Sequence, residues 1–284
     1  MFTRGWDWRR WRTLLPIAAV LLISVGLAVP SSATEDGKTQ LPTGTSMYPR
    51  LIRLADGSLL TSVLGFDSGT QTSLLRSTDE GATFHQVGTI VDGNSSAGEC
   101  CGTLFQLPRP VDGLPAGTVL WAGSFGQNGG AQRRMSIRVW ASRDDGAHWS
   151  YLSTCARNDT AAALWEPELS QAADGRLACY FGDESQNPTH SQVVAMTTSA
   201  DGVHWSAKST VIATARTAER PGMANVRRLP DGRYLMTYEN CNVPHYFCGG
   251  YIRFSADGVH WGDPGDYGTK VSTADGHYFQ HAQT

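Results

Sequence analysis

The feature of this sequence that most constrains its fold is a repeated pair of hairpins. In the copy between Trp165 and Trp205, predicted strands at 168–172 and 176–182 flank an Ala-Asp-Gly turn, and a second Asp-Gly turn follows a predicted strand at 192–199. A sheet of four short antiparallel strands buries too little apolar surface to be stable alone. Since similar stretches lie on both sides of this copy, we expect several such sheets packed against one another.

The other copies are recognised by their turns. The first hairpin recurs at 51–66, 103–123 and 225–240, and the second turns lie at 77–84, 142–149, 199–205 and 255–261. The aromatic residues that close the second turns are 65, 56 and 56 residues apart, close to one propeller blade. The sequence therefore predicts an all-β fold, a β-propeller of four-stranded antiparallel blades. We place the blades at 48–92, 100–158, 165–213 and 220–271, with the start of a fifth in the last residues.

The second turns resemble the Asp box of the sialidase superfamily, Ser-x-Asp-x-Gly-x-x-Trp. Two turns fit it, namely Ser77, Asp79, Gly81, Phe84 and Ser142, Asp144, Gly146, Trp149, and the later two are one residue shorter between Asp and Gly. We expect a structural role: Asp accepts backbone hydrogen bonds, Gly adopts positive φ, and the aromatic residue is buried beside the turn. Propellers of this superfamily typically have six blades. Four blades and part of a fifth therefore indicate an incomplete ring, and a ring closed with fewer blades is the alternative.

Residues 1–33 have the composition of a secretory signal peptide. Four arginines precede an apolar run from Leu14 to Val29, and Ser31-Ser32-Ala33 offers a cleavage site of small residues. The rival interpretation is a membrane-spanning helix, for which the run is short. We therefore predict a secreted protein whose mature part, residues 34–284, is one propeller domain that is incomplete at its C-terminal end.

The charge of the chain argues against two classes of partner. The formal net charge is −3, and the predicted signal peptide contributes +3, so the mature part carries about −6. An acidic surface disfavours binding to nucleic acid or to an anionic membrane. The sequence has no C-x-x-C motif and no paired histidines at zinc-site spacing, so we predict no metal and no cofactor. We expect a monomer.

All six cysteines lie in the mature part, where an oxidising compartment permits disulfides. Cys241 and Cys248 flank a short loop between two predicted strands, and we predict a bridge between them. The remaining four, which allow three connectivities, are Cys100, Cys101, Cys155 and Cys179. We expect the adjacent Cys100 and Cys101 not to pair with each other, and the other pairings stay open.

Candidate functional residues gather at one rim of the predicted propeller. Strand 1 of a blade starts, and strand 2 ends, at the same rim, because the two strands are antiparallel. Glu166 opens the third blade there, and Glu239 ends the second strand of the fourth. The candidate substrate-binding residues at this rim are Arg50, Trp165, Glu184, Arg220 and Tyr238. Structural ion pairs among the charged residues are the alternative to a binding site.

The segments around these residues resemble glycoside hydrolase family 93. The resemblance rests on WEPEL followed by LACYFGDES and on ARTAERPGM followed by LPDGRYLMTYEN, and it covers roughly 45–284. It implies a retaining, exo-acting α-1,5-arabinanase that binds a carbohydrate and releases arabinobiose, and this chemistry needs no cofactor. By the same resemblance Glu166 is the acid/base and Glu239 the nucleophile. Glu168, two residues further on, is an alternative acid.

Three alternatives stay open. A sialidase of the same superfamily needs three arginines around the substrate carboxylate, and Arg50, Arg220 and Arg253 are candidates, with Tyr238 as nucleophile. However, Met47 stands where the sialidase Arg-Ile-Pro opening would place an arginine. The second alternative is another exo-glycosidase. The third is a propeller that binds carbohydrate without catalysis.

Overall fold

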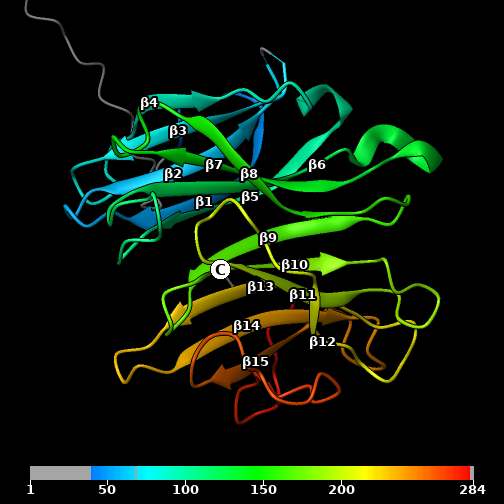
Figure 1. Ribbon diagram of the computed structural model, residues 1–284. Coiled ribbons are helices and arrows are strands. Elements are labelled where there is room, and N and C mark those ends of the chain that lie inside the picture. Colours follow the sequence, from blue (N-terminus) through cyan, green and yellow to red (C-terminus); the bar gives the residue numbers. More distant parts are fainter. Residues whose placement is uncertain (1–39, 68, 282–284) are drawn as a thin grey trace, which may run out of the picture. The chain divides into compact units, whose positions relative to one another are not determined.

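The computed structural model describes residues 40–67 and 69–281, which belong to a compact unit spanning Ala33–Thr284. The predicted signal peptide, residues 1–33, lies outside the described residues. The described part forms four antiparallel sheets, each built from four consecutive strands (Figure 1). The predicted all-β propeller is therefore confirmed.

Each blade begins and ends within two residues of its predicted bounds. The first blade consists of β1 (Ser46–Arg53), β2 (Leu59–Gly65), β3 (Gln71–Ser77) and β4 (His85–Ile90). The second consists of β5 (Glu99–Gln106), β6 (Val119–Phe125), β7 (Ser136–Ser142) and β8 (Ser150–Arg157). The third consists of β9 (Leu164–Gln171), β10 (Leu177–Asp183), β11 (Val193–Ser199) and β12 (Ser209–Ile212). The fourth consists of β13 (Arg220–Arg228), β14 (Tyr234–Cys241), β15 (Gly249–Ser255) and β16 (Thr269–Lys270).

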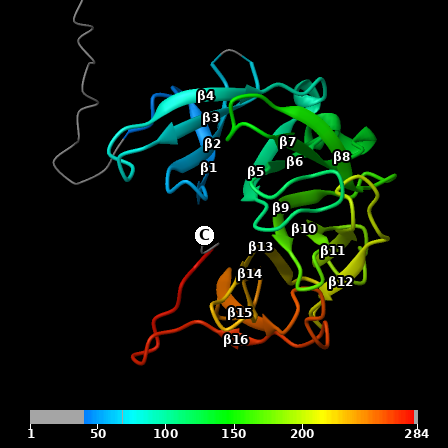
Figure 2. The same ribbon diagram turned by 60° about the vertical axis from the view of Figure 1, so that its left-hand side comes forward.

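The blades follow one another in chain order with their first strands innermost (Figure 2). Strand β1 contacts β5, β5 contacts β9, and β9 contacts β13. Apolar clusters fill the interfaces between consecutive blades, because alternate residues of each strand face the neighbouring sheet. In the third blade, which has a neighbour on both faces, every residue of β10 is buried. The first strands of all four blades are thereby held close together.

The Asp-box turns have the structural role that their sequence predicts. In the second blade Gly146 N donates to Ser142 Oγ at 2.9 Å, and His148 N donates to Asp144 Oδ1 at 2.9 Å. The shorter boxes of the third and fourth blades make equivalent bonds. Gly146 has a φ of +94°, as the turn requires.

The aromatic residues that close these turns are less buried than predicted. Trp261 is 5% exposed, whereas Trp149 and Trp205 are half-buried. Each half-buried indole directs its N–H to a polar neighbour, Trp149 to Gly146 O and Trp205 to Ser153 Oγ, both at 2.9 Å. The polar edge of the ring therefore stays near the surface while its apolar part packs against the blade.

Two of the three disulfides join strands or close a loop. The predicted Cys241–Cys248 bridge is confirmed. Cys155 in β8 is bonded to Cys179 in β10, which connects the second and third blades.

The third disulfide joins the adjacent Cys100 and Cys101, so the prediction that these two do not pair was wrong. Cys101 has a φ of 62°, a left-handed conformation that the sequence pattern did not indicate. This local turn of the backbone accompanies the contact between the two side chains.

Helical structure in the described residues is limited to two short segments, η1 (Ser95–Ala97) and η2 (Gln127–Gln132). Neither has the length of a membrane span, and no helix in 40–67 or 69–281 meets that requirement.

Candidate active site

A β-bulge near the start of the first strand shapes the rim of every blade. In β1, β5, β9 and β13, two residues stand opposite one residue of the second strand. The first bulged residues are Tyr48, Cys101, Glu166 and Met223, with φ of 52°, 62°, 47° and 51°. Bulges re-aim side chains, and non-glycine residues at positive φ are frequent at functional sites. The same local irregularity thus presents a different side chain from each blade.

Three of these four side chains line one pocket at the rim. The pocket has a volume of about 430 Å³, within the range of small-ligand sites. Its lining comes from all four blades and consists of Tyr48, Cys100, Cys101, Gln127, Trp165, Glu166, Gln192, Arg220, Glu239 and Cys241. Of the residues predicted from the sequence, the structure brings together Glu166, Glu239, Trp165 and Arg220.

Glu166 is half-buried at the opening of β9. Burial raises the pKa of its carboxyl group to about 7, and repulsion by Glu239 acts in the same direction, whereas Arg50 and Arg220 oppose the shift. A carboxyl group with such a pKa is protonated in mildly acidic solution, as a general acid must be.

Glu239 lies near the end of β14 with its side chain 13% exposed. Burial raises the pKa of its carboxyl group, and His281 opposes the shift. Oε1 lies 3.5 Å from Sγ of Cys241. Because Cys241 is bonded to Cys248, its sulfur has no proton to donate, and this is a van der Waals contact. Glu166 and Glu239 thus form a pair of carboxyl groups that interact electrostatically across two blades.

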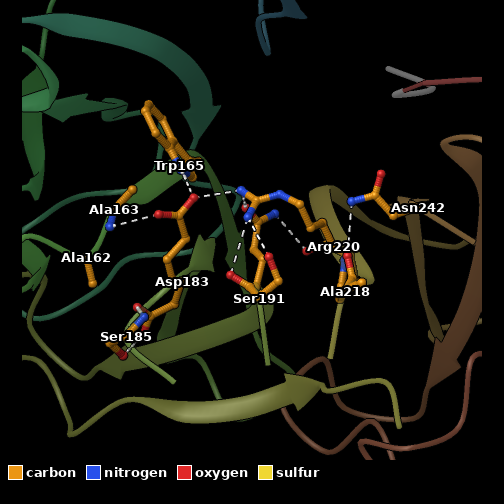
Figure 3. Close-up of polar contacts among 12 residues, drawn as sticks. Ala162, Ala163, Trp165, Asp183, Ser185, Ser191, Ala218, Arg220 and Asn242 are labelled. Atoms are coloured by element: carbon orange, nitrogen blue, oxygen red, sulfur yellow. Dashed lines mark hydrogen bonds and ion pairs between the residues drawn. The ribbon is translucent and has the colours of Figure 1, made fainter. Parts of the chain in front are cut away.

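Trp165 and Arg220 point toward each other (Figure 3), and Glu184 connects them. Trp165 Nε1 donates to Glu184 Oε1 at 3.0 Å, and Arg220 Nη2 donates to the same oxygen at 2.6 Å. Arg133 binds the other oxygen at 3.2 Å. Burial would raise the pKa of Glu184, but the hydrogen bonds from Arg220 and Trp165 outweigh it and hold that pKa below its usual value. Glu184 does not line the pocket; it orients two residues that do.

Gln192 fills a narrow space between the third and fourth blades. Its Oε1 accepts from Arg220 Nη2 at 2.7 Å, and its Nε2 donates to Pro221 O at 2.9 Å. A Cβ atom added at Gly182 would lie 3.0 Å from this Nε2, and one added at Gly222 would lie 2.5 Å from it. A side chain at Gly222 would therefore displace the amide from the position where it supports Arg220, and one at Gly182 would crowd it.

Besides Glu184, two further predicted substrate-binding residues lie outside the pocket lining. Arg50 is 9% exposed and donates from Nη1 to Asn225 Oδ1 at 3.2 Å. Tyr238 is fully buried, and its hydroxyl donates to Tyr267 O at 2.5 Å. Side chains alternate along β14, so Tyr238 and its neighbour Glu239 point to opposite faces. Arg50 acts on the site through its charge, and Tyr238 belongs to the core of the fourth blade.

Glu168, the alternative acid, is 2% exposed and has structural partners on both oxygens. Oε2 accepts from Thr103 Oγ1 at 3.0 Å, and Oε1 accepts from Val226 N at 3.2 Å and from Arg227. These contacts connect the second, third and fourth blades, and Glu168 does not line the pocket. The position fits a structural carboxylate.

Several pocket residues were missed from the sequence. Gln127 and Gln192 follow no recognised motif, because their position depends on how loops fold over neighbouring blades. Three of the missed residues lie at blade openings, namely Tyr48, Cys100 and Cys101. For two of them the repeat itself offered a signal. Aligning the openings on Glu166 would have placed Tyr48 and Cys101 at the same position of the repeat.

A larger cavity of about 1150 Å³ lies at the other end of the first strands. The arginines among its lining residues are Arg53, Arg109, Arg227 and Arg228, and its described lining contains no carboxylate. Because acid–base chemistry of this kind needs two carboxyl groups, we take the smaller pocket as the candidate active site.

Comparison with known proteins gives matches among solved structures. No protein-family model and no curated protein matches the chain. Among solved structures, an α-L-arabinanase of Penicillium chrysogenum complexed with arabinobiose has a TM-score of 0.71 and 27% identity. A family 93 α-L-arabinofuranosidase of Fusarium graminearum, also with arabinobiose, has a TM-score of 0.70 and 28% identity. Each match covers 82% of this chain and 68% of the other.

The chain has the fold of a family 93 glycoside hydrolase. This agrees with the resemblance found in the sequence around Glu166 and Glu239. A more distant propeller, a protein of unknown function from Dyadobacter fermentans with 18% identity and a TM-score of 0.57, shares the fold alone. The similarity to family 93 structures identifies the chain as a relative of glycoside hydrolases, and the two carboxyl groups of the pocket are of the kind that such hydrolysis requires.

Proposed function

We propose that this protein is a retaining exo-α-L-arabinanase, with Glu166 as acid/base and Glu239 as nucleophile. The observation that carries the proposal is the pair of carboxyl groups in one pocket, each with a raised pKa, in a chain of the family 93 fold. Carboxyl groups with shifted pKa values that interact with each other in a pocket are typical of catalytic sites.

Glu166 donates its proton to the glycosidic oxygen as the bond between that oxygen and C1 breaks. The carboxylate of Glu239 attacks C1 from the opposite face and forms a glycosyl ester. The ionised Glu166 then takes a proton from water, the water oxygen attacks C1, and the ester bond to Glu239 breaks. The two inversions give net retention and return Glu166 to its protonated state, without any cofactor.

The remaining pocket residues suit a sugar ligand. Trp165 presents an aromatic surface fixed by its bond to Glu184, and Arg220 is held by Glu184, Ser191 and Gln192. Sugars combine an apolar ring face with hydroxyl groups, and the oriented indole matches the ring face.

Two candidate residues of the sialidase alternative, Arg253 and Tyr238, are buried away from the pocket. Arg253 is 5% exposed and donates to the carbonyl oxygens of Val211 and Asp263 at 3.2 and 3.1 Å. Tyr238, the candidate nucleophile, is fully buried in the fourth blade. Neither lines the pocket, so a three-arginine carboxylate site with a tyrosine nucleophile is not assembled from these residues.

The function is tested by incubating the protein with linear α-1,5-arabinan, an aryl α-L-arabinofuranoside and a sialoside, with Glu239→Ala as the inactive control. We expect a disaccharide from arabinan. Release of sialic acid would support the sialidase instead. Binding of arabino-oligosaccharides without turnover of any substrate would support a carbohydrate-binding propeller, and turnover of other glycosides alone would indicate another exo-glycosidase.

A further inference from the structure

His281 has the same left-handed backbone conformation as the bulged residues of the four blade openings, with a φ of 61°. In the sequence a small residue or proline follows Tyr48, Cys101, Glu166 and Met223, and alanine follows His281. The segment that ends at His281 thus resembles a further blade opening.

Backbone contacts fix this segment against the fourth blade. His281 N donates to Cys248 O at 2.9 Å, and Gly250 N donates to Phe279 O at 3.0 Å. Gln280 forms a bridge with Gly249 at the start of β15. The ring of His281 packs edge-on against Phe247, with centroids 6.1 Å apart. The imidazole is therefore placed by a short stretch of regular pairing.

This placement brings His281 to the candidate nucleophile. Nδ1 of His281 lies 3.7 Å from Oε2 of Glu239. The distance is that of a charge contact, since hydrogen bonds are shorter. Arg220, the arginine of the pocket, directs its N–H groups to Glu184, Ser191 and Gln192. Among the ion pairs of the described residues, the one that Glu239 makes is with His281.

We propose that His281 is a positioning residue of this site, which keeps Glu239 ionised and its Oε2 oriented in the resting enzyme. The proposal rests on the proposed function for its catalytic meaning, although the contact itself can be tested without substrate. The two carboxyl groups repel each other, Tyr48 interacts with both, and Arg50 and Arg220 favour the ionised form of Glu166. Burial opposes ionisation of Glu239, and His281 counteracts that effect.

The test is a ¹³C NMR titration of the glutamate side-chain carboxyl groups in the substrate-free full-length protein, with Glu239 assigned from Glu239→Gln. In His281→Ala we expect the titration midpoint of Glu239 to rise by about one pH unit, because a nearby opposite charge is lost. His281→Asn keeps an uncharged N–H donor near the position of Nδ1. In this variant the titration midpoint of Glu239 should lie between those of wild type and His281→Ala.

His277→Ala is the matched control. His277 lies in the same segment, is exposed, and faces Asp275 at 3.6 Å rather than the pocket. The His277→Ala substitution should leave the titration midpoint of Glu239 unchanged. The activity counterpart is the acidic limb of kcat/KM on an aryl arabinofuranoside, which should move upward in His281→Ala, with a loss of about tenfold well below the midpoint.

The outcomes separate this proposal from the proposed function. A Glu239 midpoint that is the same in wild type, His281→Ala and His281→Asn overturns the role of His281, even where arabinan is hydrolysed. An equal rise in His277→Ala also overturns it, because the effect then belongs to the whole segment. A rise confined to the His281 variants supports the contact, and if wild type then hydrolyses no arabinoside, it is the proposed function that fails.

Discussion

Arg50 Nη1 donates to Asn225 Oδ1 at 3.2 Å, which joins the first strand of the first blade to the first strand of the fourth. The two residues are 175 positions apart in the chain. Arg50 is almost fully buried, and its charge lowers the pKa of Glu166 against the larger effect of burial. The sequence suggested Arg50 for substrate binding. In the structure it does not line the pocket, and it acts on the candidate acid, Glu166, through its positive charge.

The first prediction concerns the catalytic pair. Glu239→Ala should lose roughly 10⁴-fold or more in kcat on every substrate, because no nucleophile remains. Glu166→Ala should lose about 10²–10⁴-fold on arabinan but far less on an aryl arabinofuranoside, whose leaving group needs little protonation. Added azide should restore part of its turnover. The measurement is steady-state kinetics on both substrates, and wild-type rates of both variants on arabinan would contradict the pair.

The second prediction is a bell-shaped pH profile. Activity needs Glu166 protonated, so it should fall as the pH rises through about 7, the pKa of that group. It also needs Glu239 ionised, so it should fall on the acidic side as that carboxylate becomes protonated. The profile of kcat/KM against pH checks this. A rate that keeps rising above pH 8 would exclude Glu166 as the acid.

The third prediction concerns the effect of the Arg220 charge on Glu166. Arg220→Met removes a positive charge that favours ionised Glu166, so the pKa of Glu166 should rise and the basic limb should move to higher pH. The variant also removes the N–H donors that Arg220 directs to Gln192 and to Glu184, the carboxylate that holds Trp165, and KM should rise about tenfold or more. Arg233→Met, an exposed arginine paired with Asp231 in a distant turn, serves as control. An unshifted basic limb would refute the electrostatic role.

The fourth prediction is that Glu168 stabilises the fold. Glu168→Ala leaves the hydroxyl of Thr103 and the N–H of Val226 without their buried acceptor, and it should lower the free energy of unfolding by about 3 kcal/mol. Glu80→Ala, which breaks a solvent-exposed pair with Arg53, should change the stability little. Denaturant unfolding measures both. A stable Glu168 variant with a specific loss of activity on arabinan would move the acid role to this residue.

The fifth prediction concerns the Cys241–Cys248 bridge. Replacing both cysteines by serine should lower the stability by about 2–3 kcal/mol, because a short loop is released in the unfolded chain. Thermal unfolding of the variant and of wild type, each under non-reducing conditions, makes the comparison. Identical midpoints, together with two free thiols in unfolded wild type, would show that the bridge does not form.

The repeat, the blade bounds and the role of the Asp boxes followed from the sequence alone. Strand periodicity and Asp-Gly turns are local, so they can be read within one hairpin, and the recurrence of the hairpin gives the propeller. The same reasoning placed Glu166 and Glu239 at one rim, because antiparallel strands in consecutive blades must start and end together. The resemblance to family 93 at these segments agrees with the structural comparison.

Only the tertiary structure decided which rim residues meet in the pocket. Tyr238 and Glu239 are neighbours in the sequence, yet the first is in the core and the second is in the site, because the pleat sends them to opposite faces. The bulges that aim Glu166 into the pocket and bring Cys101 to Cys100 leave no periodic signal. The contact of His281 with Glu239 joins residues 42 positions apart in the chain. Such contacts depend on how separate blades pack, and no pattern within one strand encodes that.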